Sequence, residues 1–240
     1  MSMINIDICM PTDQTRRRFI ATTGIASVAA LAGCAGNGDG GDGSGNDTED
    51  GGDGGDGGTA NRLSWHAGGT GGTYFPLSNE IKTIVEANTD FSLNVQSTGA
   101  SVENVGSLSD GSADFALIQN DIASFAKNGT GIDAFEDNAI ESLQGVATLY
   151  PETITLVTLA GSDISTIDDL SGATINTGDL GSGTQVNANQ ILESAGISDY
   201  SEQNAGFSQA SEQLANGDID AAFVVGGWPV GAIEDLANTN

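Results

Sequence analysis

The chain is poor in the residues that enzymes most often use for nucleophilic and acid–base catalysis. It has one histidine, His66, and two cysteines, Cys9 and Cys34. Because Cys34 is the last cysteine, the remainder of the chain can form neither a Cys-His pair nor a Cys/His zinc site. No serine occupies a Gly-x-Ser-x-Gly elbow, and no carboxylate cluster is backed by histidine or cysteine at metal-ligand spacing. These absences argue against catalysis and against a structural metal.

Positive charge is also scarce, with 6 basic against 33 acidic residues and a net charge of -27. Such a balance excludes nucleic acid as a partner. Three of the cations are Arg16 to Arg18, so only Arg62, Lys82 and Lys127 follow the N-terminal segment. The depletion of lysine indicates a salt-loving source, in which salt screens the self-repulsion of an acidic surface. The alternative is a mesophilic protein whose acidic excess lies in an Asp-rich segment.

The N-terminal segment has the order of an export signal. Twin arginines at 16–17 precede an apolar run at 20–33 that ends on Leu-Ala-Gly before Cys34. The run has 14 residues, which is short for a membrane span. Residues 1–34 therefore predict a twin-arginine lipoprotein signal, with Cys34 lipidated and the mature protein anchored to the outer face of the cell membrane. Alternatively, Cys34 is an ordinary small residue of a short apolar helix.

A Gly/Asp-rich stretch follows the signal. Residues 36–58 contain no large apolar side chain that could offset the entropy of ordering. We expect 35–60 to be a disordered tether, and the 180 residues from 61 to 240 to hold the folded part.

In the folded part, strand and helix patterns alternate, which predicts an α/β fold with largely parallel sheets. The apolar patterns predict strands at 62–67, 91–96, 115–118, 145–149, 153–159, 174–176 and 221–225. They predict helices at 76–87, 102–109, 185–195, 210–215 and 229–237, and a helical turn at 167–170.

One pattern occurs twice, at 108–117 and at 214–223. Each copy has a helix end, a glycine suited to the left-handed C-cap, an aspartate and an apolar strand. Two similar lobes, 61–158 and 159–240, would explain the repetition, although this connector is common in α/β proteins. The aspartates of both copies are explained by capping and solvation.

Two glycine-rich loops, 68–74 and 178–185, each lie between a predicted strand and a predicted helix. Backbone N–H groups and the positive end of a helix dipole meet at such a turn, which suits a carboxylate or another anion. Neither loop has the Gly-Lys-Ser/Thr ending of a P-loop or the Gly-x-Gly-x-x-Gly dinucleotide fingerprint. Paired loops on facing lobes favour a two-lobed binding protein, while a simple packing role is the alternative for either loop alone.

A family resemblance rests on motifs that stand in one order along the chain. These are Gly-Gly-Thr-Gly-Gly-Thr-Tyr at 68–74, Ser-Thr-Gly-Ala-Ser-Val-Glu-Asn at 97–104, Ala-Leu-Ile-Gln-Asn-Asp at 116–121, Leu-Tyr-Pro-Glu at 149–152, Gly-Ser-Gly-Thr at 181–184 and Ala-Ala-Phe at 221–223. From about Leu63 to Leu236 the chain resembles the TAXI family of solute receptors of TRAP transporters, in a haloarchaeal, lipid-anchored form.

The resemblance implies a two-lobed, periplasmic-binding-protein-like (type II) fold that catalyses nothing and needs no cofactor. The cargo would be a small organic acid or amino acid, glutamate-like, passed to a TRAP-type membrane permease. The ligand-binding residues carried over are Gly71, Thr73, Tyr74, Ser97, Thr98, Ser101, Gln119, Ser182, Gly183 and Thr184.

Some positions stay open. Trp228 is expected in the cleft wall or in the core, and His66 either in contact with the ligand or in a packed or solvated position. An arginine clamp for a carboxylate is missing, since Arg62 lies at the edge of the matched region.

Family members continue past the helix near Pro229 to complete the first lobe, so a premature end is expected here. The alternatives are therefore a truncated, non-functional fragment, or a solute sensor for a signalling partner.

Overall fold

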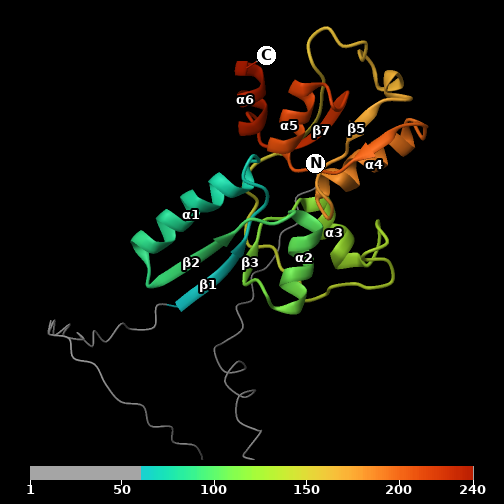
Figure 1. The fold of residues 1–240 in the computed structure, drawn as a ribbon. Helices are drawn as coiled ribbons and strands as arrows, with labels where there is room; N and C mark the ends of the chain where they lie inside the picture. Colours follow the sequence, from blue (N-terminus) through green and yellow to red (C-terminus); the bar gives the residue numbers. More distant parts are fainter. Residues whose placement is uncertain (1–60, 240) are drawn as a thin grey trace, which may run out of the picture. The chain divides into compact units, whose positions relative to one another are not determined.

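The computed structural model describes residues 61–239, so the predicted signal, Cys34 and the tether lie outside the described residues. The described chain forms two separate sheets, with strand orders β2-β1-β3 and β4-β7-β5-β6. The strands of each sheet are joined mainly through helices, as the alternating sequence pattern predicts (Figure 1).

The first sheet is entirely parallel. It contains β1 (Asn61–His66), β2 (Phe91–Gln96) and the short β3 (Phe115–Ala116), with β1 in the centre. Its helices are α1 (Tyr74–Asn88), α2 (Ser101–Asp110) and α3 (Asn120–Asn128). Helix α1 is fixed to the sheet by Trp65, whose indole N–H donates to Ser78 Oγ at 2.9 Å and whose ring stacks on Phe115 at 5.7 Å.

The second sheet is mixed. Strands β5 (Thr174–Asn176), β6 (Ser201–Gln203) and β7 (Ala221–Gly226) are parallel, and β4 (Thr153–Val157) is antiparallel to β7. Helices α4 (Gly183–Ser194), α5 (Phe207–Asn216) and α6 (Gly231–Thr239) and the 3-10 turn η1 (Ile167–Leu170) belong with it. Strand β7 is buried along its whole length, because β4 and β5 flank it in the sheet and α4 and α5 pack against it.

The repeated sequence pattern has the same structure in both copies. Gly111 and Gly217 end α2 and α5 in the left-handed conformation, with φ of 81° and 75°. The aspartate three residues later accepts a backbone N–H from the neighbouring strand, from Ser64 to Asp114 at 2.9 Å and from Thr174 to Asp220 at 2.7 Å. The pattern is thus a strand-edge connector used once in each sheet.

Four segments differ from the sequence-based expectation. Residues 145–149 form no strand, because no strand of either sheet lies alongside them to pair their backbone groups; Val146 is 77% exposed. Helix α3 and strand β6 were not expected: β6 is a short polar segment, whereas α3 has apolar residues at helical spacing, Ile122, Phe125 and Ala126, that could have indicated a helix. Strand β4 lies within 61–158 but pairs in the second sheet.

Two buried asparagines hold the ends of the strands. Asn104 donates to the carbonyls of Ala67 and Leu117, at 2.6 and 2.8 Å, just beyond β1 and β3. Its own oxygen accepts the Thr98 hydroxyl at 2.7 Å. In the second sheet, Asn176 donates to Ala205 and accepts the N–H of Gly178. These amides fix the loops that follow the strands.

No helix within residues 61–239 is long and apolar enough to cross a membrane. The one ion pair of this part of the chain joins Lys82 to Glu86 on α1. Packing and polar hydrogen bonds therefore hold the described residues together, with little help from charge pairing.

Replacing Asn104 by Ala should lower the free energy of unfolding by about 2 to 3 kcal/mol, because three hydrogen bonds are lost: the Leu117 carbonyl loses this donor, and the Ala67 carbonyl and the Thr98 hydroxyl keep only their mutual bond at 3.3 Å. The midpoint of thermal unfolding should fall by roughly 5 to 10 °C. Differential scanning calorimetry of the full chain measures it. Asn94→Ala, at an exposed position of β2, is the control. An unchanged midpoint for Asn104→Ala would contradict the assigned role.

Candidate functional site

The amino ends of several helices meet at one cavity. Both sheets are largely parallel, so each helix begins where a strand ends, and the beginnings of α1, α2, α4 and α5 and the residue preceding α3 all line the same space. The space between these helix ends measures about 560 Å³ when the part open to solvent is included. Its polar and aromatic lining residues include Thr73, Tyr74, Thr98, Ser101, Gln119, Tyr150, Glu152, Asp179, Ser182, Thr184 and Phe207.

These helix ends give the cavity a positive electrostatic component without any cationic side chain. Helices α1, α2, α3 and α5 have no side-chain N-cap, whereas Ser182 caps α4 by accepting the N–H of Gln185 at 3.0 Å. The first N–H groups of α2 donate across to the carbonyl of Gly181, at 3.0 and 3.2 Å. These two N–H groups are therefore already paired, and an anionic group in the cavity would meet the other N–H groups at the helix starts that line it.

A buried hydrogen-bond network joins the helices of the two sheets. Ser101 Oγ accepts the backbone N–H of Gln119 at 3.0 Å. The Gln119 amide then donates to Asn187 on α4 at 3.0 Å, and Asn187 donates to Asp121 at 2.7 Å. On the other side, Thr73 donates to the carbonyl of Gly227 at 2.9 Å. The two halves therefore contact each other directly on both sides of the cavity.

Gly183 permits the close approach of α4 to Gln119. A β-carbon built at Gly183 would overlap the Gln119 side-chain oxygen and come within 3.2 Å of Ile122. Gly183 is helical and lacks a positive φ, so its backbone does not require glycine. The requirement comes from the contact between the two halves.

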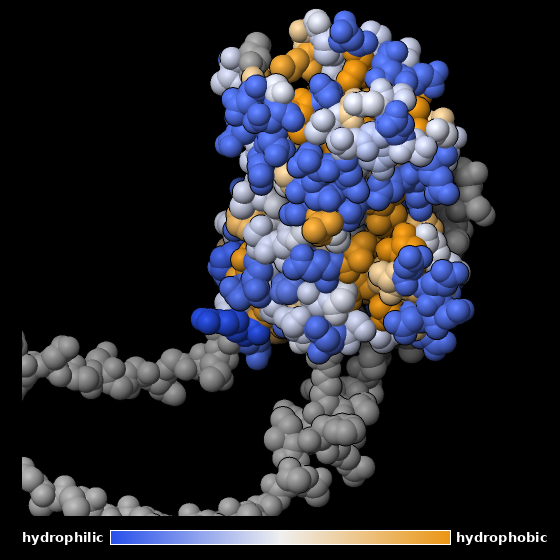
Figure 2. Space-filling view, turned by 45° about the vertical axis from the view of Figure 1, so that its right-hand side comes forward, coloured by the Kyte–Doolittle hydropathy of each residue, from blue (hydrophilic) through white to orange (hydrophobic). Residues whose placement is uncertain are grey.

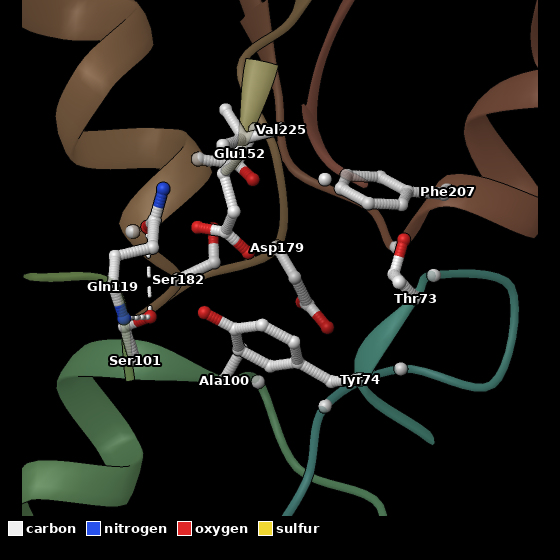
Figure 3. Close-up of a pocket in the computed structure, with 18 of the residues that line it drawn as sticks. Thr73, Tyr74, Ala100, Ser101, Gln119, Glu152, Asp179, Ser182, Phe207 and Val225 are labelled. Carbon is white, nitrogen blue, oxygen red and sulfur yellow. Dashed lines mark hydrogen bonds between the residues drawn. The ribbon is translucent and has the colours of Figure 1, made fainter. Parts of the chain in front are cut away.

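One wall of the cavity is aromatic and acidic. The rings of Tyr74 and Tyr150 lie edge to face with centroids 6.3 Å apart, and the Tyr150 hydroxyl donates to Glu152 at 3.0 Å. In Figure 3, Glu152 and Asp179 point from the second-sheet side toward Tyr74. Burial raises the pKa of the Glu152 carboxyl, and Asp121 raises it further, while hydrogen bonds from Tyr74 and Tyr150 oppose the rise.

The same environment shifts the pKa values of the two tyrosines. Burial raises the pKa of Tyr74 and of Tyr150, and the Glu152 charge adds to both shifts. Both phenols consequently stay protonated at physiological pH and remain able to donate hydrogen bonds. None of the described residues lining the cavity is lysine, arginine or histidine.

Most of the binding residues expected from the sequence line this cavity: Thr73, Tyr74, Thr98, Ser101, Gln119, Ser182, Gly183 and Thr184. Gly71 and Ser97 lie beside it. Ser97 donates to the Gly68 carbonyl at 3.0 Å, and the Gly71 carbonyl accepts the N–H of Ala232 at 3.2 Å. Their visible contacts support the first loop, while ligand contact by any of these residues stays a prediction.

Several cavity residues were not selected from the sequence. Tyr150 and Glu152 lie in the Leu-Tyr-Pro-Glu motif and Asp179 lies in the second glycine loop, so a signal existed for these three. Phe207 carried no such sequence signal, because it begins helix α5, whose sequence has no distinctive pattern of polar residues. Of the two open positions, Trp228 is 63% exposed and lines no part of the cavity, whereas His66 is buried and also does not line it.

The acidic residues do not gather into a metal site within 61–239. No group of three or more histidine, cysteine, aspartate or glutamate side chains in this range is arranged to hold an ion.

Solved structures share this architecture. An ancestral arginine-binding protein bound to arginine aligns over 75% of this chain and 75% of its own, with 15% identity and a TM-score of 0.50. The binding-protein component of an ABC phosphonate transporter from Pseudomonas aeruginosa aligns over 75% of this chain, with 13% identity and a TM-score of 0.51. The chain spans 61% of that relative's length.

At these identities the likeness shows the fold alone. The expected α/β fold of the two-lobed, type II solute-binding proteins is confirmed. The model of the NMT1-like family matches residues 66–240, which include every strand and helix after β1 as well as the whole cavity. The chain belongs to the NMT1-like family.

Proposed function

We propose that the protein is an extracytoplasmic receptor that captures a small organic acid or amino acid in the cavity between its two lobes. The observation that carries the proposal is the meeting of helix amino ends from both sheets at one cavity. Backbone N–H groups and hydroxyls can hold an anionic group reversibly, without a buried cation that would bind it too firmly. The fold, which arginine- and phosphonate-transport binding proteins share, supports this role.

The N-terminal sequence supports a place outside the cell. Export through the twin-arginine signal and lipidation of Cys34 would leave the receptor on the outer face of the membrane, with residues 35–60 as its tether. Two acyl chains on the cysteine would hold it more firmly than one.

The partner would be a membrane permease that receives the solute. The ordered motifs favour a permease of the TRAP type, driven by an ion gradient. The phosphonate relative instead serves an ABC transporter, so the class of permease depends on the motifs rather than on the fold. No enzymatic activity is proposed, because none of the described residues lining the cavity is a histidine, cysteine or lysine, the side chains that most often form or activate a nucleophile.

A solute screen by thermal shift tests the proposal. The full chain in high salt should show a saturable rise in unfolding midpoint with at least one of glutamate, glutamine, 2-oxoglutarate and succinate. A ligand present at 100 times its Kd and bound only by the native state adds about 2.7 kcal/mol. Cooperative unfolding that no small acid or amino acid shifts would contradict a receptor function.

Gly183→Ala should weaken solute binding about tenfold or more and lower the free energy of unfolding by about 1 kcal/mol, the usual worth of one hydrogen bond. The added methyl would displace the Gln119 amide and disfavour the arrangement in which the lobes meet, and a loss of 1.4 kcal/mol is already tenfold. Isothermal titration calorimetry measures the affinity. Gly106→Ala, in a helix with no atom within 4 Å of the new carbon, is the matched control. Equal affinity in both variants would exclude a role for the Gln119–Gly183 contact.

We also propose that the protein works in high salt. Its net charge is -27, and the face shown in Figure 2 is mostly hydrophilic. Raising KCl from about 0.1 to 2 M should raise the unfolding midpoint by several degrees, because the Debye length falls from about 10 Å to less than 3 Å. Sucrose at equal osmolality controls for solute exclusion, since it screens no charge. A midpoint that KCl does not raise beyond the sucrose value would contradict this proposal.

A further inference from the structure

We propose that Glu152, flanked by Tyr74 and Tyr150, binds a cationic nitrogen of the solute, so that the cargo is an amino acid rather than a dicarboxylate or a 2-oxo acid. This inference rests on the proposed receptor function and specifies the chemical class of its ligand.

The first argument is the charge of the cavity wall. Glu152 and Asp179 line the cavity, and Asp121 lies close enough to Glu152 to affect its ionisation. No lysine or arginine among residues 61–239 lines the cavity to balance these carboxylates. Lys82 is paired with Glu86, and Lys127 donates to the backbone carbonyls of Glu141 and Leu143. A second carboxylate on the solute would therefore meet like charge beside Glu152.

The second argument is the position of Glu152 between aromatic rings. Tyr74 and Tyr150 form an edge-to-face pair beside it, and the Tyr150 hydroxyl holds the carboxylate at 3.0 Å. Carboxylates and aromatic faces both attract a cationic nitrogen. This half-buried carboxylate accepts only from neutral groups, the hydroxyls of Tyr74 and Tyr150 and the Gln119 amide, and lacks the ion pair that normally compensates for desolvation. A solute ammonium would supply that partner.

The third argument is that the same cavity also suits an anionic group. The Gly-rich loops and the first turns of α1 and α4 present backbone N–H groups and hydroxyls, with Ser182 and Thr184 in the lining. A solute that carries both an ammonium and a carboxylate is complementary to both parts of the cavity. α-Amino acids have this arrangement, and neither dicarboxylates nor simple amines do.

Matched solute pairs test the inference independently of side-chain preference. Each pair joins an amino acid to the 2-oxo acid that has the same carbon skeleton: glutamate with 2-oxoglutarate, leucine with 4-methyl-2-oxopentanoate, and alanine with pyruvate. Isothermal titration calorimetry of the full chain in high salt should show at least 100-fold tighter binding of the amino acid in the pair that binds best.

Glu152→Gln should remove this preference. The amide keeps the shape and can still accept the Tyr150 hydroxyl, but it loses the charge, so amino-acid affinity should fall about 100-fold while 2-oxo-acid affinity holds or rises. Glu80→Gln makes the same charge change on an exposed part of α1 and should alter neither affinity. Circular dichroism verifies that both variants are folded.

The pH dependence adds a separate readout. Binding of an ammonium needs ionised Glu152, so wild-type affinity should fall as the pH is lowered through the raised pKa of that carboxyl. The Glu152→Gln variant should lack this dependence, and any pH dependence that persists in the variant belongs to groups other than Glu152.

The outcomes separate the two proposals. If the 2-oxo acid binds as tightly as its amino acid, or if Glu152→Gln keeps the preference, the ammonium site is wrong while the receptor function stands. Tighter binding of 2-oxo acids at low pH would mean that protonated Glu152 donates to a carboxylate, which also overturns the inference. If the folded protein binds no member of any pair and no other small acid, the receptor function itself fails and the inference with it.

Discussion

The direction of the strands determines where the groups that could bind a solute gather in this protein. In a parallel sheet each strand ends at the same edge, and the helix that follows begins there, with unpaired N–H groups and the positive end of its dipole. The chain builds such an edge twice, from β1 to β3 and from β5 to β7, and both edges border one cavity. The loops, caps and glycines can be understood as the parts that hold these helix ends in place.

Neutral polar groups make most of the contacts between the halves. Gln119 and Asn187 bond across α3 and α4, Thr73 reaches the carbonyl of Gly227, and Gly181 accepts from the first turn of α2. Each of these bonds is worth about 1 kcal/mol, which is enough to define an arrangement and too little to make it permanent. A receptor that must release its cargo needs contacts of this moderate strength between its halves. The strength of ion pairs varies more with salt, so ion pairs would hold the halves together less uniformly.

The two sheets could be predicted from the sequence more completely than the site could. Strands 91–96 and 174–176 and the stops at Gly111 and Gly217 were predicted because each has a local signal, an apolar pattern or a left-handed glycine. The strand expected at 145–149 was wrong, since strand formation depends on a partner that local pattern cannot supply. Gln119 was expected through a family motif, but its partner Asn187 lies 68 positions away in an unremarkable stretch of helix, and only the fold brings them together. Glu152 stood in the Leu-Tyr-Pro-Glu motif and could have been selected, but its place beside Tyr74 in the cavity lining appears only after folding.

The acidity of the chain and the proposed choice of cargo are physically linked. A protein with net charge -27 repels a dianion at long range and is indifferent to a zwitterion. Where salt near 1 M reduces the Debye length to about 3 Å, that long-range bias disappears and only groups in contact with the solute can discriminate. An acidic surface in high salt therefore cannot select cargo by its overall field. Selection then depends on the cavity lining, where Glu152 is partly shielded from the screening ions and the helix amino ends act over contact distances.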